Sequence, residues 1–406
     1  MYQPVRYFTF LKDVFMLSVS TFGGPQAHIA HFLRILVNKR KYLSEDDLIE
    51  INALCQVLPG PTSTQTLTAI GYKLGGPNLA YLTLIVWMLP AVVLMTLAAF
   101  ILQSFQDRNV SLDFTRFVPA MAVGFVSYAA YTMSIKTVHT RSAIALMVLA
   151  AVSSYFVFEQ VPRLSPFFCP FVLLLSGAAT SFKYKKQPKE EKTPMNISWA
   201  NFILWAAVLI VAAALGGLTH NLPIRLFENF YRNGSLIFGG GQVLTPLLYT
   251  EFVELKQYLE PREFLSGYAI AQSIPGPVFS FSAFIGTMSM QKIGAGTGGQ
   301  ILGAFASTAG IFLPGTFLIF FLIRFWDSLK KYRAVRASLE GITAASAGLV
   351  ASAAIILFQS LKPLEQNTEN AIYTYAFTVG TFILLNFKQI PSGLIIVIGL
   401  LLGWLL

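Results

Sequence analysis

Charged residues and cysteines are scarce in this sequence. Only 12% of its 406 residues are charged, 55% are hydrophobic, and the mean hydropathy is +0.61. A composition this apolar excludes a soluble globular protein and predicts an integral membrane protein. The two cysteines, Cys55 and Cys169, lie in apolar surroundings and form no motif with histidine, so neither a disulfide nor a metal site is expected.

Catalytic and nucleotide-binding motifs are also missing. The sequence has no Ser-His-Asp set, no metal-ligand cluster and no P-loop. Gly294, Gly296 and Gly299 have a dinucleotide-binding spacing, but no strand precedes them. We therefore expect neither an enzyme nor a cofactor. The net charge of +10 lies in short loops between apolar stretches, which is a topology signal of membrane proteins and excludes a nucleic-acid partner.

What the sequence does have is a series of long apolar runs. Nine of them are close to the roughly 20 residues that a single membrane crossing needs. They cover residues 78–103, 117–135, 143–159, 167–181, 199–218, 301–323, 341–361, 371–385 and 393–406. The first apolar stretch contains Lys12 and Asp13 and has no small-residue cleavage pattern, so we expect no removable signal peptide. The predicted fold is an all-α membrane bundle in contact with the lipid bilayer.

Two Gly/Pro breaks occur twice, 216 residues apart, which indicates an internal duplication. The first copy has Phe22-Gly23-Gly24-Pro25-Gln26 and Gln56-Val57-Leu58-Pro59-Gly60-Pro61; the second has Phe238-Gly239-Gly240-Gly241-Gln242 and Gln272-Ser273-Ile274-Pro275-Gly276-Pro277. Each break frees backbone N–H and C=O groups that lipid cannot satisfy, so the breaks belong beside a site. The short flanking stretches predict broken-helix hairpins that enter the membrane and return, or two short crossings.

The duplication sets the domain plan. Residues 1–182 form the first repeat, 183–198 a basic cytoplasmic linker, 199–219 a connecting transmembrane helix and 220–406 the second repeat. Each repeat has two hairpins and about four crossings, so one extra helix between them inverts the second repeat. The first-repeat loop around Lys39 is basic, whereas its counterpart after Glu251 is rich in Glu, as inversion requires. This pattern places the N-terminus in the cytoplasm.

The breaks also supply the candidate anion site. Thr62, Ser63 and Thr64 follow the first Pro-Gly-Pro, and hydroxyls and free amides at the start of a half-helix attract anions. Glutamine amides near the breaks can donate without a buried charge. The predicted anion-binding residues are Gly23, Gly24, Gln26, Gln56, Gly60, Thr62, Ser63, Thr64, Gly239, Gly240, Gln242, Gln272, Gly276 and Ser280. Ordinary helix caps and helix–helix hydrogen bonds would explain the same residues without an anion.

Several charged and titratable residues lie near these breaks. Lys12, Asp13 and Arg232 are candidate coupling charges, although side chains that reach the membrane interface would also fit. His28 and His31 could couple protons, but their position beside the basic loop favours a helix-surface role. Glu340 is expected in a loop.

The paired motifs resemble the chromate transporter family in its two-domain, long-chain form. The resemblance covers almost the whole chain and implies a multi-pass transporter of the cytoplasmic (inner) membrane that exports chromate, with sulfate as the similar physiological anion. One departure is Thr62, where Asn is frequent in the family, and it bears on the anion preference. The expected partners are chromate or a sulfate-like oxyanion, and a homodimer is an open alternative to the monomer. A sulfate carrier with little chromate activity is the alternative; a membrane-embedded enzyme or a structural bundle is the alternative from another class.

Overall fold

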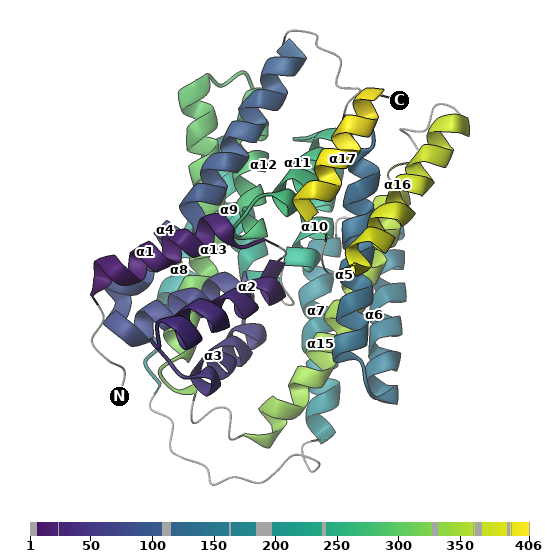
Figure 1. The fold of residues 1–406 in the computed structure, drawn as a ribbon. Helices are drawn as coiled ribbons and strands as arrows, with labels where there is room; N and C mark the ends of the chain where they lie inside the picture. Colours follow the sequence, from purple (N-terminus) through teal and green to yellow (C-terminus); the bar gives the residue numbers. More distant parts are fainter. Residues whose placement is uncertain are drawn as a thin grey trace. The chain divides into compact units, whose positions relative to one another are not determined.

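The computed structural model describes residues 6–22, 24–107, 115–161, 164–183, 197–237, 241–326, 332–359, 361, 368–387, 390 and 392–405. Within these ranges the chain forms helices and turns and no strand, which confirms the all-α prediction. The first half contains α1 (Tyr7–Ser20), α2 (Gly24–Phe32), the π-helix η1 (Leu33–Lys39), α3 (Glu45–Val57), α4 (Thr62–Asp107), α5 (Val118–Thr137), α6 (Arg141–Gln160) and α7 (Ser165–Ser181) (Figure 1).

The second half repeats this order after a connecting helix. Its elements are α8 (Ala200–Thr219), α9 (Leu222–Leu236), α10 (Gly241–Tyr249), the π-helix η5 (Thr250–Leu255), α11 (Pro261–Ser273), the short 3-10 turn η6 (Val278–Ser280), α12 (Phe281–Lys292), α13 (Thr297–Leu322), α15 (Arg333–Gln359), α16 (Thr368–Asn386) and α17 (Ser392–Leu405). Helix α4 is broken at Gly75 and Gly76, where φ is −153° and +73°. That break corresponds to the gap between α12 and α13, and it confirms the predicted boundary before residue 78.

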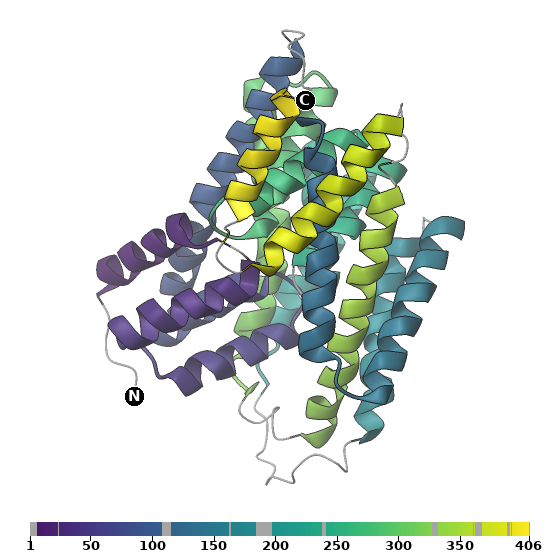
Figure 2. The same cartoon turned by 45° about the vertical axis from the view of Figure 1, so that its right-hand side comes forward.

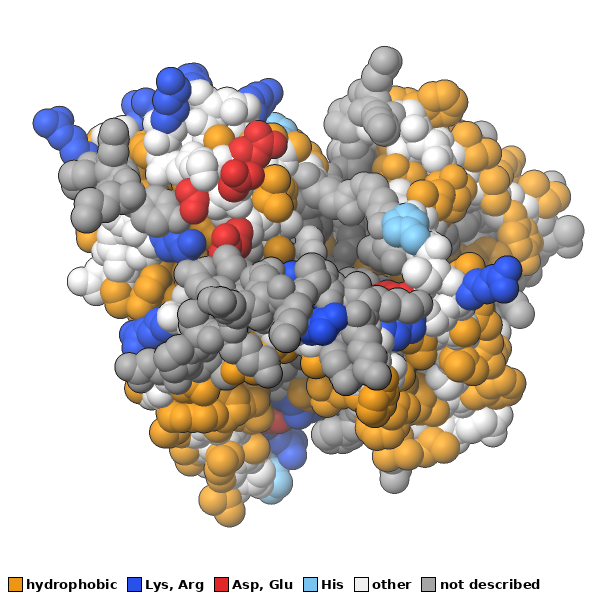
Figure 3. Space-filling view, turned by 90° about the horizontal axis from the view of Figure 1, so that it is seen from below, with side chains coloured by type: hydrophobic (Ala, Val, Ile, Leu, Met, Phe, Trp, Pro, Cys, Tyr) orange, Lys and Arg blue, Asp and Glu red, His pale blue; other side chains and the backbone are white. Residues whose placement is uncertain are grey.

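The helices are long and apolar enough for a multi-pass membrane protein. Six described helices meet the length and hydropathy of a membrane span, and three shorter apolar helices coincide with the remaining predicted crossings. Large hydrophobic side chains on α8 are exposed, among them Ile203, Ile210 and Leu218. Figure 3 shows areas of hydrophobic side chains, in orange, on the face that it draws, beside Lys, Arg, Asp and Glu side chains.

The chain divides into two compact units that each take segments from both repeats. The first unit contains residues 1–97, 191–241 and 274–330, and the second contains residues 98–190, 242–273 and 331–406. In the first unit, α1, α2 and α3 lie side by side, shown in purple in Figures 1 and 2. They share a buried core with α4 and α13, built around Phe32, Leu54, Trp87 and Ile319. In the second unit, α15 packs against α5, α6 and α7.

Backbone details recur at equivalent positions of the two repeats. The π-helices η1 and η5 lie at the same place in their hairpins. Each is followed by a non-glycine residue in the left-handed region, Lys41 (φ 55°) and Gln257 (φ 53°). Left-handed backbone costs roughly 1–2 kcal/mol for such residues, so its presence at both positions is a strong mark of a shared fold. The structure therefore supports the duplication beyond its sequence motifs.

The repeats also exchange packing contacts in the second unit. Gly124 on α5 lies so close to α16 that an added Cβ would be 2.8 Å from the carbonyl oxygen of Thr378. The equivalent glycine, Gly348 on α15, faces α6, and its Cβ would be 2.1 Å from the carbonyl oxygen of Met147. In each repeat a glycine thus packs against the backbone of a helix from the other repeat, because only glycine permits backbones to approach this closely.

Candidate functional site

Two backbone hydrogen bonds join the breaks of one repeat to the helix ends of the other. The N–H of Gly60, in the first Pro-Gly-Pro, donates to the carbonyl of Ile237 at the end of α9 (2.7 Å). The N–H of Gly276, in the second Pro-Gly-Pro, donates to the carbonyl of Thr21 at the end of α1 (3.0 Å). The four residues are equivalent in pairs, so the exchange is reciprocal, as across an isologous interface. All four lie in the first unit.

The backbone conformation at Gly60 and at Gly276 requires glycine. Their φ angles are +114° and +101°, a region in which a side chain is strained. Each also packs on the other repeat: Gly60 faces Gly315 of α13, and Gly276 faces Ala91 of α4. The two breaks therefore satisfy backbone groups that lipid could not, and they do so within protein.

Gln65 braces the first break, and sequence reasoning missed it. Its side chain is 2% exposed, and its Nε2 donates to the carbonyl of Pro59 (2.7 Å) and, at the longer distance of 3.4 Å, to that of Gly315. The repeat-equivalent residue is Phe281, so this brace is found in the first copy alone among the described residues. A comparison of the two copies at each position would have singled it out.

The start of α4 presents three buried hydroxyl residues. Thr62, Ser63 and Thr64 are 9%, 4% and 2% exposed, and they begin the helix directly after Pro61. The first backbone bond of the helix runs from the N–H of Gln65 to the carbonyl of Pro61. The N–H groups of the three hydroxyl residues come before it, and the first N–H groups of a helix have no carbonyl acceptor within the helix. Hydroxyls and free amides at a helix start can hold an anion.

A wall of aromatic residues closes one side of these hydroxyls. The ring nitrogen Nδ1 of His28 lies 2.9 Å from Oγ of Ser63, and the indole N–H of Trp87 donates to Oγ1 of Thr64 (3.1 Å). The His28 ring meets Trp87 edge-on, with centroids 5.2 Å apart. His28 is buried, so the expected helix-surface role is wrong for it: α2 turns this face toward α4, and apolar packing encloses the ring. His31 is partly exposed and contacts Arg34, as a surface residue would.

The other predicted site residues lie on several different elements or outside the described residues. Gly23, Gly239 and Gly240 lie outside the described residues; the backbones of Gly24 and Gln26 begin α2, and that of Gln242 begins α10. Gln56 is exposed on α3. Ser280 is buried and donates to the carbonyl of Pro277 (2.7 Å), whereas Nε2 of Gln272 donates to the hydroxyl of Tyr268 (2.6 Å) in the second unit.

Two of the three candidate coupling charges, Asp13 and Arg232, have protein partners. Asp13 is buried on α1 and accepts hydrogen bonds from Arg40 (2.7 Å) and Tyr42 (2.6 Å), which joins α1 to the hairpin loop. Burial and the bond to Asp13 raise the pKa of the Tyr42 hydroxyl, which keeps it protonated as a donor. Arg232 pairs with Glu228 one turn earlier on α9 (3.0 Å), and Lys12 is exposed.

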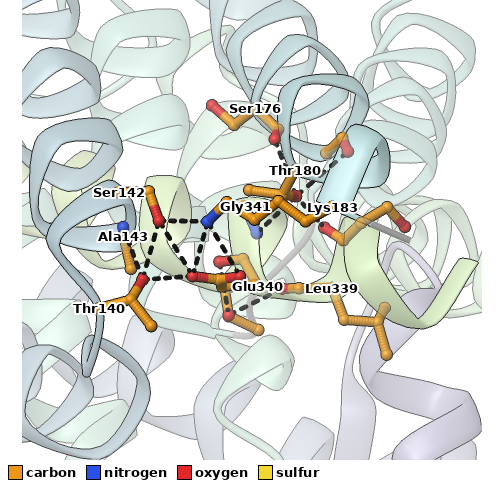
Figure 4. Close-up of polar contacts among 12 residues, drawn as sticks. Thr140, Ser142, Ala143, Ser176, Thr180, Lys183, Leu339, Glu340 and Gly341 are labelled. Carbon is orange, nitrogen blue, oxygen red and sulfur yellow. Dashed lines mark hydrogen bonds and ion pairs between the residues drawn. The ribbon is translucent and has the colours of Figure 1, made fainter. Parts of the chain in front are cut away.

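A separate polar cluster lies in the second unit (Figure 4). Glu340 accepts hydrogen bonds from Thr140 and Lys183, and Ser142 donates to it at the longer distance of 3.3 Å. Glu340 belongs to α15, so its expected place in a loop is wrong: the helix begins eight residues before the predicted apolar run, and the ion pair satisfies the charge there. The cluster joins α15 to the start of α6 and to the residues just after α7, which is a structural role.

The family profile and three of the curated relatives that match this chain carry names of chromate transport. Residues 8–182 and 224–404 match the sequence profile of the family described as "Chromate transporter". The chain is 28% identical to a probable chromate transport protein of Synechococcus elongatus, covering 94% of this chain and 91% of that protein. It is 25% identical to the chromate transport protein of Cupriavidus metallidurans (94% and 88% covered) and 24% identical to that of Pseudomonas aeruginosa (99% and 93% covered). No solved structure matches the chain.

Proposed function

The chain belongs to the chromate transporter family, and from that premise we propose that it is a secondary transporter of chromate or a similar tetrahedral oxyanion in the cytoplasmic membrane. The observation that carries the proposal is the reciprocal pairing of the two Pro-Gly-Pro breaks beside the start of α4. Broken helices at a repeat interface are where transporters of this architectural class bind their substrates.

The anion is held by neutral donors in this proposal. Thr62, Ser63 and Thr64 offer hydroxyls and backbone N–H groups, and the α4 dipole points its positive end at the same place. Neutral donors spare the empty site an unpaired buried cation, whose cost in a membrane is high. Chromate and sulfate are both tetrahedral dianions, and this donor set does not distinguish chromium from sulfur. A sulfate carrier with little chromate activity is therefore the second candidate.

Transport proceeds by alternating access of two inverted repeats. An odd number of crossings separates equivalent points of the repeats, and the loop charges reverse between them, which supports inversion. The reciprocal bonds of Gly60 and Gly276 support a two-fold relation between the repeats. Alternating access then opens the site to each side in turn, and with the cytoplasmic side loaded the net direction is efflux.

Inversion is tested with a matched pair of cysteines. Lys39 and Leu255 are repeat equivalents at the ends of η1 and η5, and both are exposed. The native Cys55 and Cys169 are buried, so the labelling background is low. In intact cells an impermeant maleimide should modify Leu255→Cys and spare Lys39→Cys until the cells are permeabilised. Equal labelling of both in intact cells would defeat the inverted arrangement.

The transported anion is tested by flux. Purified protein in proteoliposomes should take up radiolabelled chromate above protein-free liposomes, with unlabelled sulfate competing. Uptake of sulfate with negligible chromate uptake would select the sulfate carrier. Uptake of neither anion, in either orientation of the gradient, would refute oxyanion transport.

A further inference from the structure

A histidine of α2 is enclosed beside the proposed anion site with one ring nitrogen unused. His28 is 1% exposed, and its Nδ1 bonds to Ser63. Its Nε2 is buried and has no hydrogen-bond partner among the described residues. A buried polar atom without a partner carries a desolvation penalty, so its persistence calls for an explanation in function.

The group formed by His28, Ser63 and Trp87 occurs in the first repeat alone. The residues equivalent to His28, Ser63 and Trp87 are Leu244, Phe279 and Ile311. Each of the three first-repeat side chains has a hydrogen-bonding group, and each equivalent in the second repeat has none, although the three positions come from separate stretches of chain. Such a joint change means that the three residues work as one group, and that the group serves something that the second repeat does not provide.

The hydrogen bond to Ser63 fixes how the group works. When Nδ1–H donates to Oγ of Ser63, the serine proton is free to be donated to an anion, and Nε2 presents a lone pair. The other tautomer would leave an N–H buried without an acceptor and would use the serine proton on the ring. The first tautomer therefore suits the empty site, and it leaves a proton acceptor next to the place where a dianion would bind.

We propose that His28 takes up a proton at Nε2 when a tetrahedral dianion binds at the start of α4, so that each anion is moved together with a proton. This inference rests on the proposed function and names its coupling ion. The proton comes from the aqueous side to which the site is open, and no bond other than N–H is formed. The imidazolium is then stabilised by the anion, and by reciprocity the proton strengthens anion binding.

Few other groups titrate around this ring. His31, one turn further along α2, is the titratable residue whose charge acts on His28. Helix α4 contacts the ring through Ser63 and Trp87, neither of which changes charge between pH 6 and 9. His31 is partly exposed and therefore serves as the matched control.

The test measures protons and anion in the same experiment. Sulfate is the probe because it stays a dianion throughout the working range. Calorimetric titration of the purified full chain in HEPES and in Tris gives the number of protons taken up per sulfate bound. We expect uptake approaching one proton near pH 7.5, and a sulfate Kd that rises about tenfold per pH unit where uptake is complete.

The variants separate coupling from structure. His28→Asn keeps a donor at the Nδ1 position for Ser63 but has no titratable atom; it should bind sulfate with no proton uptake and with a Kd that is flat with pH. His31→Gln should keep the proton uptake of the wild type. If His28→Asn does not fold, His28→Gln replaces it, with the same expectation. Proton uptake that persists in either His28 variant, or wild-type binding without uptake, overturns the inference alone. Absence of both sulfate and chromate binding in the wild type overturns the proposed function.

Discussion

Replacing Ser63 by alanine tests the anion site at its centre. The hydroxyl is expected to donate a charge-assisted hydrogen bond to the bound dianion, and such bonds contribute roughly 1.5–3 kcal/mol. Its loss should therefore weaken sulfate binding about 10- to 150-fold. The measurement is the Kd of purified variants by calorimetry or by displacement of labelled sulfate.

The structure adds a stability cost that must be separated from this loss. Ser63 bonds to His28 inside the protein, so Ser63→Ala leaves the histidine Nδ1 unpaired, at a cost of about 1–3 kcal/mol. Replacing both partners with apolar residues removes the unpaired atom, and such double replacements can be nearly neutral. His28→Leu combined with Ser63→Ala should thus melt close to the wild type while binding sulfate as weakly as Ser63→Ala, or more weakly.

A buried serine elsewhere in the first unit supplies the control. Ser289 on α12 bonds to the carbonyl of Ile285 within its own helix (2.7 Å), and no hydrogen bond described for it reaches the start of α4. Ser289→Ala should leave the Kd unchanged. If Ser63→Ala and the double variant both bind sulfate with the wild-type Kd, the hydroxyl does not contact the anion and the proposed site is wrong.

Three further substitutions, the last with a matched control, test the supports of the fold. Gln65→Leu removes the hydrogen bond to the Pro59 carbonyl and should lower the free energy of unfolding by about 1–3 kcal/mol, measured by thermal melting. An unchanged Tm would mean that this hydrogen bond does not stabilise the fold. Asp13→Asn should lower the Tm because it discharges the acceptor of two hydrogen bonds, and a Tm that does not move would contradict the buried ion pair. Gly348→Leu should prevent folding, whereas Gly380→Leu, whose Cβ would meet nothing within 4 Å, should be tolerated; equal yields of both would contradict the close packing.

The helices and breaks could be predicted because their causes are local. Apolar runs of span length and Gly/Pro punctuation are visible in the sequence, and the duplication confirms each break by its copy. The break in α4 at Gly75 and Gly76 was not itself predicted, but it agrees with the apolar run expected to begin at residue 78. The π-helices η1 and η5 were not predicted, because one extra residue per turn leaves no mark on hydropathy.

The polar partners could not be predicted because they are distant in sequence. Asp13 meets Arg40 and Tyr42 across 27 and 29 residues, and His28 meets Ser63 across 35. The motif gave Ser63 as a candidate, but nothing in its neighbourhood indicates a histidine partner. The basic loop beside His28 even favoured the surface, which the packing of α2 against α4 contradicts.

The asymmetry of the two copies follows from the same contacts. Duplication gives both repeats the backbone of a break, and the bonds of Gly60 and Gly276 keep that backbone in both. Side chains are free to diverge once the backbone is held, and around the second break the equivalent of Ser63 became Phe279. One anion needs one set of donors, so in the proposed transporter a single equipped break suffices. The equipped break should therefore lose binding on substitution, whereas Phe279→Leu, at the equivalent position, should leave the sulfate Kd unchanged; a loss of affinity there as large as that of Ser63→Ala would mean that both breaks hold the anion.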